Sequence, residues 1–128
     1  MRGAPGMRLV LESDPRLNLV RSYGEGVIVI GEQRITHPCI VTPRTLLLDW
    51  AARSVEELSE GELEPLWGLS IDILLLGAGE RAAWPSAALR SALRTRAIAL
   101  ECMNLGAACR TYNILANEQR AVAAALFP

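Results

Sequence analysis

The sequence predicts an α/β domain that begins with a meander of short antiparallel strands. Short apolar stretches separated by glycine-containing turns fill the first third of the chain. Residues 71–76 (IDILLL) are almost all apolar, which is typical of a parallel strand covered on both faces. A helical pattern follows after Pro85, and a second short apolar stretch lies at 98–101. This strand–helix–strand order favours a right-handed crossover between two parallel strands.

The meander is predicted from alternation and turn residues. Residues 17–23 alternate apolar and polar side chains, and glycines at 24 and 26 allow a tight turn into a second strand at 27–30. A third strand is expected at 34–36. Prolines on either side of 39–42 predict an edge or irregular strand there, and 46–50 is apolar again.

Three helices are predicted from apolar spacing and capping residues. Ser59 and Glu62 form a capping-box pattern before Leu63, Leu66 and Trp67, although residues 54–57 offer a competing start. The second helix opens at Pro85-Ser86, with Leu89 and Leu93 facing inward and Arg90 and Arg94 outward. The third has Asn104 as its candidate cap, and its expected buried stripe comprises Leu105, Ala108, Cys109, Tyr112 and Leu115.

The end of the chain, residues 120–127 (RAVAAALF), fits two structures. Alanine favours a helix. The segment is nevertheless short and follows a helix end, so we expect a final strand. With 128 residues, the chain fits one domain at 9–128 after a flexible tail at 1–8.

Charge and composition exclude several classes of function. A net charge of −1 gives no overall attraction for nucleic acid. No apolar run is long enough to span a membrane, and the first residues lack the apolar core of a signal peptide, so we expect a cytoplasmic protein. The chain contains no lysine, which excludes a Schiff-base lysine and a phosphate-binding P-loop. One histidine and three cysteines without a Cys-x-x-Cys pair predict no metal site, no disulfide framework and a reducing compartment.

Residues 77–82 (GAGERA) match a dinucleotide-binding fingerprint, with Glu101 at the place of an acidic ribose ligand. In that fold the glycines must open a helix at once, whereas Trp84-Pro85 interrupts this segment. We therefore interpret the glycines as a tight turn and predict no nucleotide cofactor.

A crevice is expected where the two parallel strands end. Helix N-termini near Ser86 and Asn104 would direct unpaired amides into it, and Arg81 would lie above it on the loop at 77–85. An anion or the acidic loop of a partner fits such a place, with Trp84 as an anchor. The alternative is that the caps satisfy the amides and that water solvates Arg81. Cys102 either has a thiol pKa lowered by the nearby helix end or is structural.

The carboxy-terminal half carries a family resemblance. The run ILLLGAG at 73–79 and the motif CMNLGAACRTYNIL, followed by Glu118 and an alanine-rich end, resemble a small single-domain family. That family includes mitochondrial respiratory complex I assembly factor 3 and a vertebrate adipogenesis-associated protein, with short stand-alone bacterial relatives.

The resemblance implies a three-layer fold in which helices flank a central mixed sheet, with a last strand antiparallel to its neighbours. It implies no known reaction, and it supplies no catalytic residues that can be carried over to this chain. We predict no cofactor. The first hypothesis is a bacterial protein-interaction or assembly factor. The second is a small-anion binder or an enzyme at the crevice, for which Glu101 and Cys102 are the nearest titratable groups. The oligomeric state and the partner are open.

Arg110 and Asn113, on the exposed flank of the last helix, are expected to hold the loop at 77–85. The candidate ligand- or partner-binding residues are Gly77, Gly79, Arg81, Trp84, Ser86, Cys102, Asn104, Arg110 and Asn113.

Overall fold

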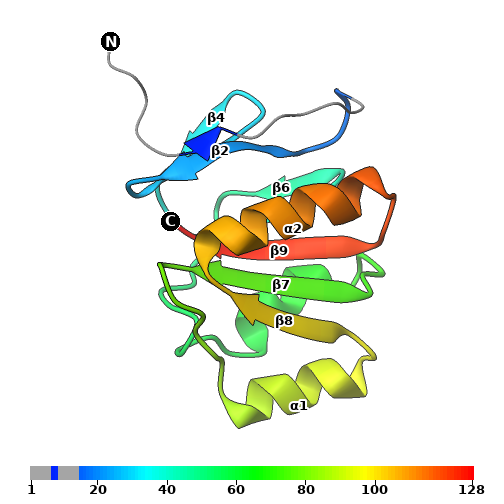
Figure 1. Cartoon of the computed structure of the whole chain (residues 1–128). Coiled ribbons are helices and arrows are strands. Elements are labelled where there is room, and N and C mark those ends of the chain that lie inside the picture. Colours follow the sequence, from blue (N-terminus) through cyan, green and yellow to red (C-terminus); the bar gives the residue numbers. More distant parts are fainter. Residues whose placement is uncertain (1–6, 9–14) are drawn as a thin grey trace.

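A computed structural model describes residues 7–8 and 15–128. Within these residues, two sheets are formed: sheet A with the order β1-β2-β3-β4, and sheet B with the order β6-β5-β9-β7-β8 (Figure 1). Sheet A comprises β1 Met7–Arg8, β2 Val20–Gly24, β3 Val27–Ile30 and β4 Gln33–Ile35. Sheet B comprises β5 Cys39–Thr42, β6 Thr45–Leu47, β7 Ile73–Ala78, β8 Ala99–Met103 and β9 Val122–Phe127. The helices are the 3₁₀ helix η1 Gly61–Leu66, α1 Ala87–Thr95 and α2 Leu105–Asn117.

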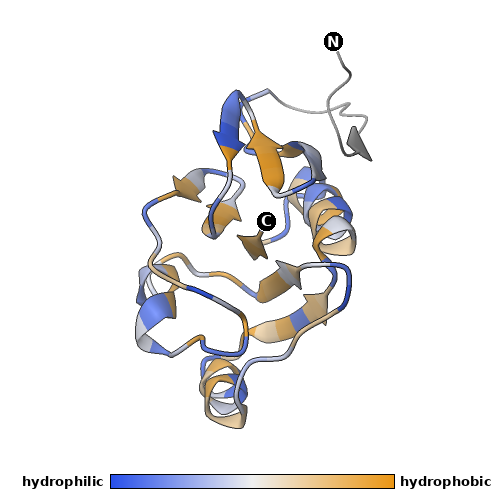
Figure 2. Cartoon of the chain, turned by 90° about the vertical axis from the view of Figure 1, so that its left-hand side faces the viewer, coloured by the Kyte–Doolittle hydropathy of each residue, from blue (hydrophilic) through white to orange (hydrophobic). Residues whose placement is uncertain are grey.

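Helices lie on both sides of sheet B, so the expected three-layer α/β class with a central mixed sheet is confirmed (Figure 2). One apolar cluster joins sheet A and α2 to one face of sheet B. The other joins η1 and α1 to the opposite face. Along β9, Ala124 belongs to the first cluster, whereas Ala123 and Ala125 belong to the second.

Of the predicted meander, the segments at 39–42 and 46–50 pair as β5 and β6 in sheet B rather than in sheet A. The earlier segments form β2, β3 and β4 of sheet A, which is antiparallel throughout its described strands. Its first turn uses positive φ angles at Gly24, Glu25 and Gly26. Of the expected tail at 1–8, residues 1–6 lie outside the described residues. Met7 and Arg8 pair with Tyr23 and Ser22, so sheet A begins before the expected domain boundary at residue 9.

The prediction of an edge or irregular strand at 39–42 is wrong, because β5 lies inside sheet B and pairs without interruption with β6 and β9. All four residues of β5 are buried. Pro38 and Pro43 lie just outside the strand, so their missing N–H groups do not interrupt its hydrogen bonds. The partner that encloses β5 comes from the far end of the chain, since Ile40 pairs with Ala125.

The last segment is the expected strand, β9, but only one of its neighbours is antiparallel. It runs antiparallel to β5 and parallel to β7. All six residues are buried, and hydrogen-bonding partners on both sides outweigh the helical preference of alanine. The small alanine side chains allow helices to approach both faces of the sheet closely.

The segment after Ser59 forms a short 3₁₀ helix rather than a longer α-helix. Pro65 lies within it and cannot donate a backbone hydrogen bond. Half of the capping box forms: the Ser59 N–H donates to Oε1 of Glu62 at 3.0 Å. Leu63 and Leu66 are buried as expected, and Trp67 is partly buried with the guanidinium of Arg96 3.9 Å above its ring.

Candidate functional site

The strands β7 and β8 end at the same edge of sheet B. They are parallel, with Leu76 beside Cys102 and Gly77 beside Met103. The chain then leaves this edge twice, into the connection at 79–86 and into the start of α2. The predicted meeting of two strand ends is therefore confirmed.

The helix ends at this edge are capped from within. The Leu89 N–H donates to the Ser86 hydroxyl at 3.2 Å, and the Ala107 N–H donates to the Asn104 carbonyl oxygen Oδ1 at 2.8 Å. The Leu105 N–H donates to the Gly79 carbonyl oxygen at 3.0 Å. Ser86 and Asn104 thus serve as helix caps, which leaves fewer amides for an anion than an open helix end offers.

Gly77 and Arg81 line neither of the two hollows described below. Gly77 is buried within β7 rather than in a turn, and a Cβ there would lie 2.3 Å from the Cβ of Ala108 in α2. Gly77 is therefore a close-packing residue. Arg81 is exposed on the connection.

The first hollow, of about 610 Å³, lies between the β2–β3 turn of sheet A and the start of α2. Two acidic residues, Glu25 and Glu80, are among those that line it, and the guanidinium of Arg110 donates to the hydroxyl of Tyr23 at its wall. A Cβ on Gly106 would lie 2.8 Å from the Tyr23 side chain, so this side chain packs closely against the start of α2. Its lining residues are Tyr23, Gly24, Glu25, Gly26, Gly79, Glu80, Asn104, Leu105, Gly106, Arg110 and Pro128.

Arg110 and Asn113 do not hold the loop at 77–85, so that expectation is wrong. Asn113 is buried rather than on an exposed flank. Its Oδ1 accepts from the Val20 N–H at 2.9 Å, and its Nδ2 donates to the Val20 carbonyl oxygen at 2.9 Å. The Tyr112 hydroxyl donates to the Asn18 carbonyl oxygen at 2.7 Å. Tyr112 and Asn113 of α2 therefore bind the segment where β2 of sheet A begins.

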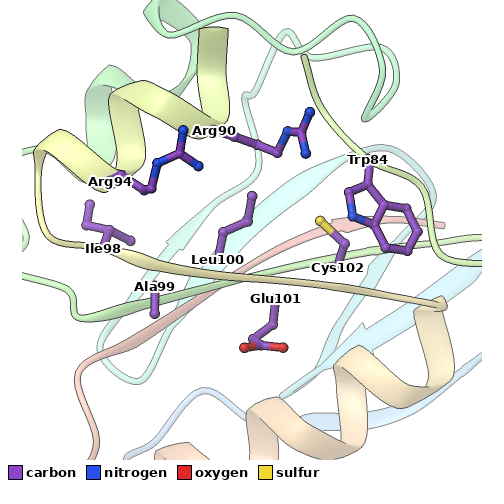
Figure 3. Close-up of a pocket in the computed structure, with 8 residues that line it drawn as sticks. All are labelled: Trp84, Arg90, Arg94, Ile98, Ala99, Leu100, Glu101 and Cys102. Carbon is purple, nitrogen blue, oxygen red and sulfur yellow. The ribbon is translucent and has the colours of Figure 1, made fainter. Parts of the chain in front are cut away.

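The second hollow, of about 410 Å³, lies between α1 and the outer side of β8 (Figure 3). Arg90 and Arg94 extend from α1 on one side of it, and Trp84 lies beside Cys102 (Figure 3). The side chains of Glu101 and Cys102 leave β8 on opposite faces, so they do not act together on one substrate atom (Figure 3). The residues that line the second hollow are Trp84, Arg90, Arg94, Ile98, Ala99, Leu100, Glu101 and Cys102.

The thiols are not activated. Burial raises the pKa of Cys39 and of Cys109 to about 12. The pKa of Cys102 is also raised, first by burial and then by the charge of Glu101, so a thiol pKa lowered by the helix end is not found. A thiol with a raised pKa is almost entirely protonated at neutral pH and is a poor nucleophile.

We expect iodoacetamide at pH 8 to label Cys102 first in the folded protein. Cys102 is partly exposed, whereas Cys39 and Cys109 are fully buried. All three rates should rise with pH, because the thiolate fraction increases toward the raised pKa values. Mass spectrometry of tryptic peptides at timed intervals measures the order, and labelling in urea provides the control in which the three sites react alike. Equal labelling of Cys109 and Cys102 in the folded state would contradict the assignment.

Two further features define what the described residues offer. They contain no group of three or more histidine, cysteine, aspartate or glutamate side chains placed to hold a metal ion. They also contain no helix that is both long and apolar enough to cross a membrane.

Sequence reasoning did not assign Tyr23, Arg90 and Arg94 to a site. Tyr23 accepts a hydrogen bond from Arg110, which lies 87 positions later in the sequence, and local sequence patterns do not predict such distant contacts. The spacing of Arg90 and Arg94 did predict an outward-facing pair. The sequence did not show the order of strands in sheet B, in which β8 is the last strand and lies beside Arg90 and Arg94.

Both a family profile and individual proteins of known name match this chain. A profile described as "Protein of unknown function (DUF498/DUF598)" matches residues 20–127. A Bos taurus protein named NADH dehydrogenase [ubiquinone] 1 alpha subcomplex assembly factor 3 is 30% identical over 94% of this chain and 66% of its own length. A Francisella tularensis protein named 13 kDa major membrane protein is 24% identical over 80% of this chain and 84% of its own.

A crystal structure of a Bordetella parapertussis protein is similar to this fold. It superposes with a TM-score of 0.79 at 32% identity and covers 88% of this chain and 96% of its own. The chain covers 66% of the length of the bovine relative and 60% of the length of the human relative, which is less than two thirds of each.

Proposed function

Because the chain belongs to the DUF498/DUF598 family of proteins of unknown function, we propose that it is a protein-interaction domain that assists the assembly of a complex. The observation that carries this proposal is the 30% identity to the bovine assembly factor along 94% of the chain. We place its action in the bacterial cytoplasm, which its three free cysteines support.

The chemistry of the second hollow supports an interaction role over catalysis. An enzyme needs a titratable group matched to its task within reach of a substrate. In the second hollow the thiol of Cys102 has a raised pKa, and Glu101 leaves the opposite face of β8. Exposed arginine and tryptophan side chains are instead the types enriched at protein interfaces.

The proposal is tested by capture of the tagged full chain from cells that express it. We expect one or a few proteins to co-purify in stoichiometric amounts and the complex to re-form from purified components during gel filtration. The same tag on an unrelated domain of similar size is the control. Absence of any partner that re-forms a complex would contradict the proposal.

A small anion in the first hollow is the second candidate, favoured by the guanidinium of Arg110 at its wall. The carboxylates of Glu25 and Glu80 in the same lining oppose it. Inorganic phosphate that raises the melting temperature of the chain, and fails to do so for Arg110→Ala, would support this candidate.

A further inference from the structure

The outer side of β8 offers backbone hydrogen-bonding groups without a strand to receive them. Among the described residues, β8 is the last strand in the order of sheet B. The Ala99 N–H donates inward to the Asp72 carbonyl oxygen at 2.8 Å. Since backbone groups of a strand face its two sides alternately, the N–H and C=O groups of Leu100 and Cys102 face outward. Such an edge is a template for one more strand.

Two arginines stand beside this edge. Arg90 and Arg94 lie one helical turn apart on α1, both are exposed, and both line the second hollow (Figure 3). Among the described residues, Arg96 pairs with Glu60, whereas Arg90 and Arg94 form no ion pair with a carboxylate. A segment lying along β8 would therefore meet two available positive charges on one of its faces.

An apolar contact lies at the other end of the hollow. Trp84 is 54% exposed and lies beside Cys102, at the end of β8 opposite Arg94 (Figure 3). An exposed tryptophan next to a hollow is a typical anchor in protein recognition. Along the edge of β8, unpaired backbone groups therefore lie next to two arginine side chains, and an exposed tryptophan lies at one end.

We infer that the edge of β8 binds an extended, acidic segment of a partner protein, which adds to sheet B as an outer strand next to Leu100 and Cys102. Alternate residues of that segment face α1, so carboxylates two residues apart meet Arg90 and Arg94, and an apolar residue follows at Trp84. This inference rests on the proposed interaction function and names the chemistry of the partner.

Charge argues against two other occupants. A second copy paired antiparallel at β8 would place its own α1 on the same face, with Arg90 and Arg94 facing their counterparts. Like charges opposite one another destabilise such a pairing. For nucleic acid, the net charge of −1 gives the chain no overall attraction.

The test uses the full chain and a blocked synthetic peptide in which glutamate alternates with valine and a phenylalanine follows. We expect binding in calorimetry, with hydrogen-exchange protection and NMR shifts centred on the amides of Leu100 and Cys102. In Arg90→Glu/Arg94→Glu the peptide should bind about tenfold more weakly at low salt, and the difference should shrink as salt rises. The matched control Arg34→Glu/Arg44→Glu makes the same change in net charge at exposed positions away from β8 and should keep the affinity.

Strand addition is separated from simple charge attraction by two further measurements. A peptide of the same sequence with N-methyl groups on alternate amides should not bind, since it lacks the donors that pair with the edge. Leu100→Pro removes an outward N–H of β8 and should abolish protection while sheet B stays folded.

Three results would overturn the inference: equal binding by the N-methylated peptide, tighter binding of an oligothymidylate than of the peptide, or dimerisation of the chain that Leu100→Pro abolishes. A natural partner that binds Arg90→Glu/Arg94→Glu and Leu100→Pro at full affinity would also overturn it, while leaving the proposed function intact.

Discussion

Replacing Gly77 by alanine is expected to lower the stability of the fold by about 3 kcal/mol, the upper part of the usual range for overpacked cores. The new Cβ would lie 2.3 Å from the Cβ of Ala108, far closer than two carbon atoms can approach. Neither atom can rotate away, because each is fixed to the backbone of a buried element. Either α2 or β7 must move, and that disturbs the packing of α2 on sheet B. Thermal unfolding should show a melting temperature lower by roughly 10 °C.

Two variants make this result specific. Gly68→Ala is the matched control, because a Cβ there meets nothing within 4 Å, and its stability should change by less than about 1 kcal/mol. Ala108→Gly removes the other overlapping carbon, so the double variant should be more stable than Gly77→Ala alone, despite the cost of about 1 kcal/mol for glycine within a helix. A stable Gly77→Ala protein would show that the contact between β7 and α2 is looser than described.

The second large effect is expected from Asn113→Leu, which keeps the size of the side chain and removes its amide. The Val20 N–H and C=O would both lose their partner, and Val20 has no solvent exposure at which water could replace it. Each buried, unsatisfied backbone group costs about 1–3 kcal/mol, so the variant should lose roughly 2–6 kcal/mol in urea unfolding. Hydrogen exchange should accelerate first in β2 and β3, because sheet A loses one of its hydrogen-bonded attachments to α2.

Asn117→Leu provides the control at an exposed position of the same helix, with an expected change within about 0.5 kcal/mol. Asn113→Asp is informative in addition, since aspartate still accepts from the Val20 N–H but cannot donate to the Val20 carbonyl oxygen. A loss smaller than about 1 kcal/mol in Asn113→Leu would mean that sheet A is held chiefly by its apolar contacts.

Features encoded by neighbouring residues were predictable. Glycine turns located the strands of sheet A, the apolar run at 71–76 located β7, and Ser86 and Asn104 cap the helices for which they were proposed. These signals act within a few residues, where side-chain and backbone chemistry alone decides the conformation.

Features that depend on distant segments were not predictable from local patterns. β5 is an interior strand because β9, more than 80 residues later, encloses it. Asn113 was expected on the exposed flank of the last helix because it lies outside the apolar stripe, yet the backbone of Val20, 93 positions away, pairs with it. The role of Gly77 was misread for the same reason, since the helix that contacts it follows after β8.

The position of β9 also determines how the domain is made. This strand lies between β5 and β7, yet it leaves the ribosome after both of them. Until it emerges, β5 and β7 have a vacant place between them, and the nascent chain exposes two unpaired edges to its surroundings. A premature stop codon before Val122 would therefore remove the middle of the sheet rather than trim its border, and such a product should require chaperones and be degraded.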